Sequence, residues 1–407
     1  MMTAHPATEI VDRQKMLILL LVGVIFIFSL TAVLNRIELV RMRSDLWARW
    51  YATRQWLDTG RSLYDEQNGV EAAALVPVPP SPLEAGYYYP AYFLIITLPL
   101  AIIPFQAAHF VWTATGLFLL FSAIAIAHRT FGWPSDANQL TVFVILSAIS
   151  LPVFQHAIWS QFDTIAPFCL AVSFALVKKK QPFWAGVALA GLALKPQDAL
   201  PLLIILPVAA WFHRSARPLI AGLATALLAL LASAFLLQPD WISGFLTALQ
   251  AYAPLGDIAR PGYSFLGGTL GPAAALLLFA LAIRVFWPHR TVDLLSPEFR
   301  LIVCIALGIW WWSFESIVMI HLVAIPVVLI LFFSALQELT PEYVRPLSWL
   351  VAGWYALGWA VFVLALTLLP PGWQINLAEF VHKSVFPLAL TIISIHILSL
   401  KKTANHV

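Results

Sequence analysis

Long apolar runs separated by short polar segments dominate the chain. A hydrocarbon core about 30 Å thick is crossed by about 20 apolar residues in a helix. On that scale the sequence predicts twelve membrane spans, at residues 16–35, 106–127, 140–154, 164–177, 183–194, 200–212, 219–237, 269–286, 301–312, 317–333, 347–369 and 385–400. We therefore expect an all-α polytopic membrane protein with a single transmembrane domain, residues 1–407.

The first run resembles a signal peptide in its basic flank, Arg13 and Lys15. It is too long for a typical signal core and lacks a small-residue cleavage pattern, so we interpret it as a retained anchor whose N-terminus is cytoplasmic.

The segment 91–104 is apolar but short, and Pro90, Pro99 and Pro104 interrupt it. Such a segment fits an interfacial or re-entrant helix better than a span. The basic residues favour the same interpretation. If the segment does not cross, the cytoplasmic side collects 14 Lys and Arg. The outer side keeps nine, of which only Lys195, Arg260 and Lys383 lie beyond the long first outer segment. This bias predicts a multi-pass cell-membrane protein with both termini cytoplasmic.

Composition supports the membrane class, because 61% of residues are hydrophobic and only 11% are charged, whereas about a quarter are charged in soluble domains. No sizeable soluble domain fits such a chain. The formal charge of +3 records orientation and does not indicate nucleic-acid binding. Cys169 and Cys304 both lie in apolar runs, so we expect small buried hydrophobes and no disulfide or metal pair.

The first extracytoplasmic segment, residues 36–104, contains a predicted interfacial helix that begins after Ser44 and stops at Gly60. Trp47, Trp50 and Tyr51 share one face of it, while Arg49 and Arg54 are expected to face elsewhere. This pattern is typical of an amphipathic helix on the membrane surface. A second long outer segment is expected at residues 238–268.

Several outer-side polar residues are candidates for chemistry. Asp45 opens the predicted helix, where the helix dipole favours a carboxylate; a general base is the functional alternative. Gln161 and Asp163 precede the fourth span and either cap it or bind substrate.

Basic and ionisable residues later in the chain face the same side. Lys195 ends the fifth span and either snorkels or holds an anion, and Arg260 is a weaker candidate of the same type. Glu315 and His321 flank the start of the tenth span; ionisable groups at that depth usually face a cavity, the alternative being a packing histidine.

Together these groups suit a reaction on a lipid-borne phosphate. Lys195 and His321 would neutralise a leaving phosphate while Asp45 takes a proton from a hydroxyl. The sequence has no phosphate-cradling glycine loop, no metal-spaced His/Cys cluster and no G-x-S-x-G turn. We therefore do not expect a nucleotide-consuming cytoplasmic enzyme, and we expect no cofactor and no metal-ligating residues. The rival hypotheses are a lipid or solute transporter or flippase and a glycan polymerase or ligase that uses a diphosphate-linked donor.

In order and spacing, a series of short motifs up to about residue 335 resembles the polyprenol-phosphate-mannose-dependent glycosyltransferases of family 87, which share the GT-C fold. The motifs are Asp45-Leu46, Trp50-Tyr51-Ala52, Gly60, Leu63-Tyr64-Asp65, Tyr89-Pro90, 98–101, Ile103-Pro104, Ser160-Gln161, Ala185-Gly186, Leu194-Lys195-Pro196, 313–321, Leu322 and Pro326.

The resemblance implies an inverting transfer of mannose from a polyprenyl phosphate to a lipid or glycan acceptor on the extracytoplasmic side. Asp45 matches the family's catalytic aspartate, Lys195 its lysine after the fifth span, and His321 the histidine beside the donor phosphate. We expect Arg260 to assist in phosphate binding, and Tyr89, Gln161, Asp163 and Glu315 to contact substrate. Two departures from the family pattern, Ala91 for a proline and 160–163 for Gly-Gln-x-Asn, bear on the sugar and the acceptor more than on the fold.

Overall fold

The computed structural model describes residues 23, 25–42, 44–77, 85–196, 199–257, 277, 279–281, 283–314, 319–368 and 373–404. Within these ranges the regular elements are α-helices and 3₁₀-helices, without strands. The all-helical expectation is therefore confirmed for this part of the chain.

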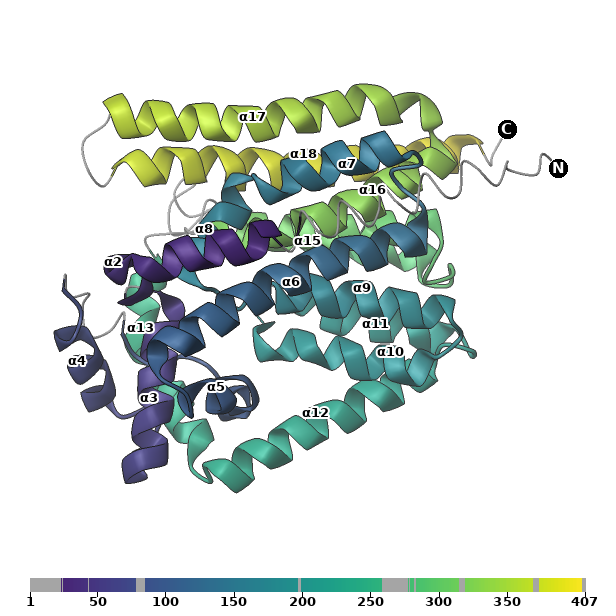
Figure 1. The fold of residues 1–407 in the computed structure, drawn as a ribbon. Helices are drawn as coiled ribbons and strands as arrows, with labels where there is room; N and C mark the ends of the chain where they lie inside the picture. Colours follow the sequence, from purple (N-terminus) through teal and green to yellow (C-terminus); the bar gives the residue numbers. More distant parts are fainter. Residues whose placement is uncertain are drawn as a thin grey trace, which may run out of the picture.

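The long helices run roughly side by side and form a bundle, with shorter helices gathered at one of its ends (Figure 1). The helices of the bundle are α6 (Phe105–Phe131), α7 (Ala137–Ala148), α8 (Leu151–Trp159), α9 (Ile165–Lys178), α10 (Pro182–Leu189), α11 (Leu200–Phe212), α12 (Pro218–Leu237), α15 (Pro297–Phe314), α16 (Ile325–Leu339), α17 (Val344–Leu368) and α18 (Trp373–Ala404). The elements at the end are α2 (Glu38–Met42), α3 (Asp45–Thr59), α4 (Glu66–Ala74), α5 (Leu94–Ala101) and α13 (Trp241–Asp257), with the 3₁₀-helix η1 (Ala91–Phe93).

Four stretches of described helix are long and apolar enough to cross a membrane, and a bent pair, α7 with α8, brings the number to five. Other apolar helices, such as α9 and α11, have 10 to 17 residues. One such break separates α7 from α8. Helix α8 begins with Leu151-Pro152 after extended backbone at Ser150. Proline suits this first turn of a helix because it has no N–H to donate. The total of twelve spans stays a prediction.

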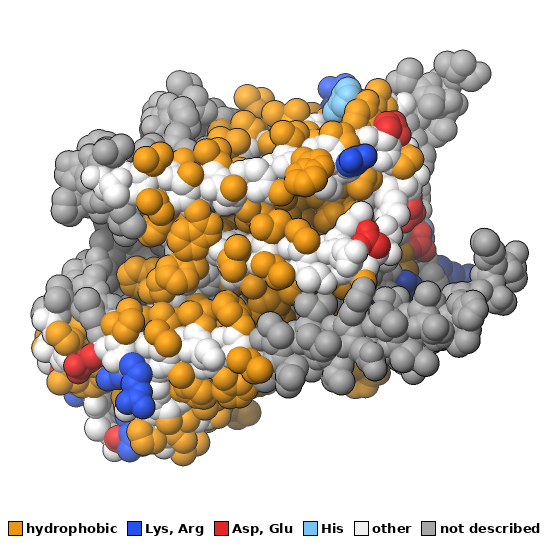
Figure 2. Space-filling view, turned by 45° about the horizontal axis from the view of Figure 1, so that its top comes forward, with side chains coloured by type: hydrophobic (Ala, Val, Ile, Leu, Met, Phe, Trp, Pro, Cys, Tyr) orange, Lys and Arg blue, Asp and Glu red, His pale blue; other side chains and the backbone are white. Residues whose placement is uncertain are grey.

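The surface of the bundle has the pattern of a membrane protein. Figure 2 shows hydrophobic side chains over the middle of one face, with the charged side chains near its two ends. Large apolar side chains such as Phe118, Leu228 and Trp349 are more than half exposed. In water so large an apolar surface would promote aggregation, whereas in a bilayer it contacts lipid.

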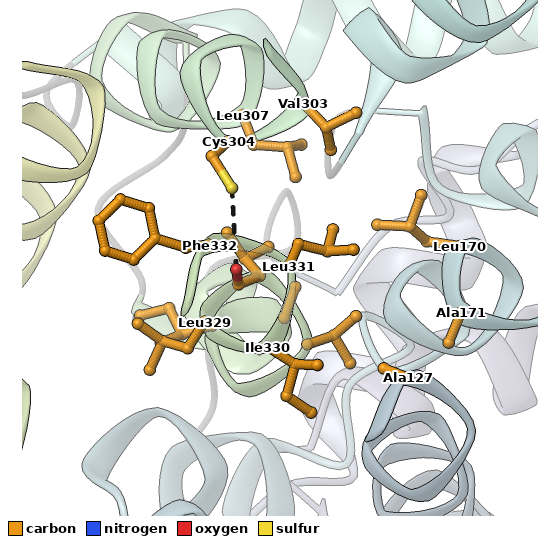
Figure 3. Close-up of a cluster of buried hydrophobic side chains, with 14 of the residues drawn as sticks. Ala127, Leu170, Ala171, Val303, Cys304, Leu307, Leu329, Ile330, Leu331 and Phe332 are labelled. Atoms are coloured by element: carbon orange, nitrogen blue, oxygen red, sulfur yellow. Dashed lines mark hydrogen bonds between the residues drawn. The ribbon is translucent and has the colours of Figure 1, made fainter. Parts of the chain in front are cut away.

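The core at the centre of the bundle is apolar. Cys304 and Leu307 of α15 face Phe332 of α16, and Leu170 of α9 and Ala127 of α6 complete the cluster (Figure 3). The Cys304 thiol lies 3.8 Å from the carbonyl oxygen of Val328, so this cysteine is a buried small hydrophobe, as expected.

The interfacial helix α3 has the predicted limits. Gly60 ends it in the left-handed conformation, with φ of 72°, and donates its N–H to the carbonyl of Trp56 at 3.0 Å. The aromatic face of α3 packs on the protein: the Trp47 ring lies 4.7 Å from that of Phe105, and Trp50 donates to the carbonyl of Leu100 at 3.0 Å. Arg49 lies on a different face of α3 from these aromatic side chains, as predicted, but it is buried within the protein.

The short apolar segment after Pro90 lies alongside α3. Tyr89, just before η1, contacts Asp45 at the start of α3, and the carbonyl of Ala101 at the end of α5 accepts from Arg54 at 3.2 Å. Between them the hydroxyls of Thr53 and Thr97 lie 2.9 Å apart. Both ends of the segment thus stay at one end of the bundle, as an interfacial or re-entrant helix requires.

The start of the second outer segment packs on the first. Gln238 donates to the hydroxyl of Ser62 at 2.6 Å and accepts from the backbone of Leu63 at 3.3 Å. The Tyr64 ring lies 6.1 Å from that of Phe245 in α13. Residues 258–268 of this segment lie outside the described residues.

Helices α10 and α12 approach closely where each has a glycine. A Cβ at Gly186 would overlap the carbonyl oxygen of Leu219, and one at Gly222 would overlap that of Phe183. We expect Gly186→Ala to lower the free energy of unfolding by about 1–3 kcal/mol, because the helices must separate. Thermal unfolding in detergent measures this loss.

The matched control is Gly353→Ala in α17, where an added Cβ meets nothing within 4 Å. We expect it to be neutral or slightly stabilising, since alanine favours helix over glycine by about 1 kcal/mol. Equal melting temperatures for Gly186→Ala and the unmodified protein would contradict the close packing.

Candidate active site

Asp45, at the first turn of α3, is held by two neighbours. Its Oδ1 lies 3.1 Å from a guanidinium nitrogen of Arg49, and its Oδ2 accepts from the hydroxyl of Tyr89 at 3.2 Å. The Asp45 side chain is 21% exposed while that of Arg49 is 8% exposed. The carboxylate is therefore fixed in orientation and still accessible to a second molecule.

Lys195 follows the 3₁₀-helix η2 (Ala190–Leu194) that extends α10. Its ammonium group forms a buried ion pair with Asp163 and donates to Oε1 of Gln161 at 3.2 Å. The side chains of Lys195 and Asp163 are 5% and 1% exposed. Lys195 therefore does not snorkel, and the residue at the N-cap of α9 is Thr164, not Asp163.

Tyr89 lies between these two charge pairs. Burial raises the pKa of its hydroxyl well above the ordinary value; Lys195 and Arg49 lower it, and Asp45 and Asp163 raise it. All four charged groups thus act on one phenol, which stays protonated at neutral pH and donates to Asp45. The Arg49 guanidinium lies 5.2 Å from the centre of the Tyr89 ring, in cation–π geometry.

Aromatic and backbone contacts position both pairs. The Tyr89 ring stacks on Phe93 at 4.2 Å, and the Phe162 ring, between Gln161 and Asp163, lies 4.7 Å from Phe93. Tyr92 of η1 donates to the carbonyl of Ala193 at 2.9 Å, two residues before Lys195. The segment 89–93 therefore joins the Asp45 side of the site to the Lys195 side.

The loop that carries Gln161 and Asp163 is anchored from α6. Ser160 has a positive φ of 46°, and its hydroxyl lies 2.6 Å from that of Thr113 and 2.9 Å from Nε2 of His109. The other ring nitrogen of His109 lies 3.2 Å from Oδ1 of Asn35, in the segment that leads to Asp45. Trp112 donates to the carbonyl of Gln161 at 3.1 Å. These contacts fix a strained backbone turn beside the ion pair.

Of three further expected site residues, the structure describes only the backbone of His321. Arg260 and Glu315 lie outside the described residues. The backbone of His321 belongs to the 3₁₀-helix η5 (Met319–Ala324), which contacts α8 and α9, but its side chain lies outside the described set. The roles of all three stay predictions.

The model of glycosyltransferase family 87 matches residues 87–316, which are 230 of the 407 residues. The chain belongs to glycosyltransferase family 87. No curated protein and no solved structure matches it.

This membrane glycosyltransferase carries most of its candidate site inside the matched region, including Tyr89, Gln161, Asp163 and Lys195. Asp45 lies before that region and His321 after it. Membership of a glycosyltransferase family favours an enzyme over the transporter alternative.

Sequence reasoning missed Arg49 as a site residue. The sequence contains a signal for the Asp45–Arg49 pair, because a carboxylate and a guanidinium four residues apart on a helix are neighbours. The prediction for this helix used only the aromatic side chains on its other face. Among the described residues no three His, Cys, Asp or Glu side chains are grouped as metal ligands.

The burial of the Lys195–Asp163 pair predicts how its variants change the free energy of unfolding of this glycosyltransferase. Replacing Asp163 by Ala leaves the ammonium without its carboxylate, which costs about 3–5 kcal/mol at a buried pair. We expect the double variant Asp163→Leu/Lys195→Met to recover much of that loss, because it removes both charges. Thermal unfolding of the purified variants measures the difference.

The control is the exposed pair between Arg54 and Asp58, whose side chains are 40% and 48% exposed. Arg54→Gln should cost less than about 1 kcal/mol. A double variant at 163 and 195 no more stable than Asp163→Ala would contradict the charge argument.

Proposed function

We propose that this glycosyltransferase moves mannose from a polyprenyl phosphate to a hydroxyl of a lipid or glycan acceptor, on the extracytoplasmic side and with inversion at the anomeric carbon. Asp45 is the general base. Lys195, with His321 and Arg260, holds the donor phosphate, and Tyr89, Gln161, Asp163 and Glu315 contact substrate.

The proposal rests on two different charged environments that lie on either side of Tyr89. An accessible carboxylate lies on one side of this residue, and a buried ammonium with its amide and carboxylate partners lies on the other. Inversion in one displacement needs a base at the acceptor and a stabilised leaving group at the donor, and this pair of environments supplies both.

In the proposed step, Asp45 accepts the proton of the acceptor hydroxyl as its oxygen bonds to the anomeric carbon. The bond from that carbon to the phosphate oxygen breaks, and the leaving polyprenyl phosphate takes the electron pair. Lys195 stabilises the charge that develops on the phosphate. Tyr89 and Arg49 hold the Asp45 carboxylate in one orientation, because each binds a different oxygen. Further lone pairs on these oxygens remain to accept the proton of the acceptor hydroxyl.

The placement of basic residues supports the extracytoplasmic side. Helix α6 begins beside Trp47 and ends at Phe131, whose ring lies 5.1 Å from the guanidinium of Arg300. Lys178 donates to the carbonyl of Thr130 at that same end. The loop that carries Gln161 contacts α6 at Trp112, and the basic end lies at Phe131. The helix between these two residues is about 28 Å long, and positive residues mark the cytoplasmic side.

A lipid-linked donor is supported by the surroundings of Lys195. Helix α3, which carries Asp45, lies at the end of a bundle with an apolar surface (Figures 1 and 2). A donor whose polyprenyl chain lies in the bilayer would bring its phosphate to this end, and the buried ammonium must become accessible for the two to meet. The sequence has no glycine-rich loop for a nucleotide diphosphate.

The proposal predicts a loss of activity in Asp45→Asn. The amide cannot accept the proton, so we expect transfer of labelled mannose from polyprenyl phosphate mannose to fall about 10²–10⁴-fold. The rate with saturating donor and acceptor is the measurement, and an unchanged melting temperature shows that the variant folds.

Asp58→Asn is the matched control, because Asp58 lies on the same helix, is exposed and contacts only Arg54 in the hydrogen bonds of the described residues. Its activity should equal that of the unmodified enzyme. Full activity of Asp45→Asn would refute the assignment of the base, and absence of transfer by the unmodified enzyme from this donor would refute the donor.

A further inference from the structure

Buried polar groups next to the ion pair lack partners among the described residues. Nδ1 of His156 and Oγ1 of Thr164 each have no hydrogen bond there. Their residues are 1% and 0% exposed. A buried donor or acceptor without a partner costs free energy, so such atoms usually meet a ligand or water that the protein binds.

The side chains of His156 and Thr164 lie together beside α6. From the position that a Cβ on Gly116 would take, Oγ1 of Thr164 is 3.3 Å away and Nε2 of His156, the ring nitrogen opposite the unpartnered Nδ1, is 3.0 Å away. The absence of a side chain at Gly116 therefore leaves room for both.

The same cluster is close to the proposed phosphate site. Asp163 and Lys195 both act electrostatically on His156, and Thr164 follows Asp163 directly in sequence. Helix η5, whose backbone includes His321, packs on α8 and α9. His156 belongs to α8, and Thr164 is the N-cap residue of α9. The donor-phosphate candidates and the unpartnered groups thus come from adjoining elements.

We propose that His156 and Thr164 bind the phosphate of the lipid donor together with Lys195. This inference rests on the proposed function and extends its phosphate site into α8 and α9. Asp163 already offsets the charge of Lys195, so a phosphate there needs further donors. A hydroxyl and an imidazole N–H supply them from fixed positions.

The test is binding of a polyprenyl monophosphate to the purified full chain in detergent, followed by tryptophan fluorescence, with the matching polyprenol as the second probe. Thr164→Val and His156→Leu should each weaken binding of the monophosphate about 10-fold, which is the effect of losing a hydrogen bond to a charged group. Binding of the polyprenol should not change. Thr164→Ser and His156→Asn keep a donor near the original position and should restore most of the affinity.

Ser173→Ala is the matched control on α9, because the Ser173 hydroxyl is buried and donates to the carbonyl of Ala185 at 3.0 Å. It should leave monophosphate binding unchanged. Thr164→Val should keep its melting temperature, since it removes no hydrogen bond between described residues.

The outcomes distinguish a failure of His156 and Thr164 as phosphate ligands from a failure of the proposed donor. If the unmodified protein binds the monophosphate and Thr164→Val and His156→Leu bind it equally well, the inference is wrong while the proposed donor stands. If those variants melt earlier but bind normally, the groups hold a structural water or side chain and the inference is again wrong. If the unmodified protein does not bind the monophosphate, the proposed function fails and the inference fails with it.

Discussion

Charge compensation in apolar surroundings is the constraint on which this site depends. Lys195 is almost completely buried, and an isolated ammonium there would lose its hydration without return. Asp163 supplies the opposite charge and Gln161 a further acceptor. The loop between α8 and α9 must therefore lie against the end of η2. The second pair, Asp45 with Arg49, follows the same rule at a more accessible position.

The first outer segment is joined to the bundle by aromatic side chains. Trp47 and Trp50 of α3 pack on Phe105, and Trp50 also donates to the backbone just before that residue. Buried aromatic rings add large apolar contact, while their N–H groups find carbonyl partners. These contacts hold one face of α3, the Arg49–Tyr89 and Thr53–Thr97 contacts hold another, and the Asp45 carboxylate at the start of the helix therefore has a defined position.

Much of the helical plan followed from local rules. The limits of α11 agree with the predicted run at residues 200–212, and α3 ends at Gly60 as predicted. Both features depend on residues that are neighbours in the sequence: the length of an apolar run, and a glycine that adopts the left-handed conformation. The partners of Lys195 and Arg49 were not predicted. Asp163 is 32 residues from Lys195 in sequence, and nothing local distinguishes an ion-pair partner from a helix cap. The room beside Gly116, which His156 and Thr164 share, likewise arises only from the packing of α6 on α8.

Tyr89 connects the proposed base and the proposed phosphate site, which come from different parts of the chain. Asp45 and Arg49 precede the region that matches the family, whereas Lys195 and Asp163 lie inside it. The Tyr89 hydroxyl donates to Asp45, and its ring packs on Phe93 and Phe162, which adjoin the Lys195 side. Because burial raises the pKa of this phenol, the hydroxyl keeps its proton, and with it this link, at neutral pH. In the proposed reaction, a shift of the Lys195 side would therefore move the hydroxyl that orients Asp45.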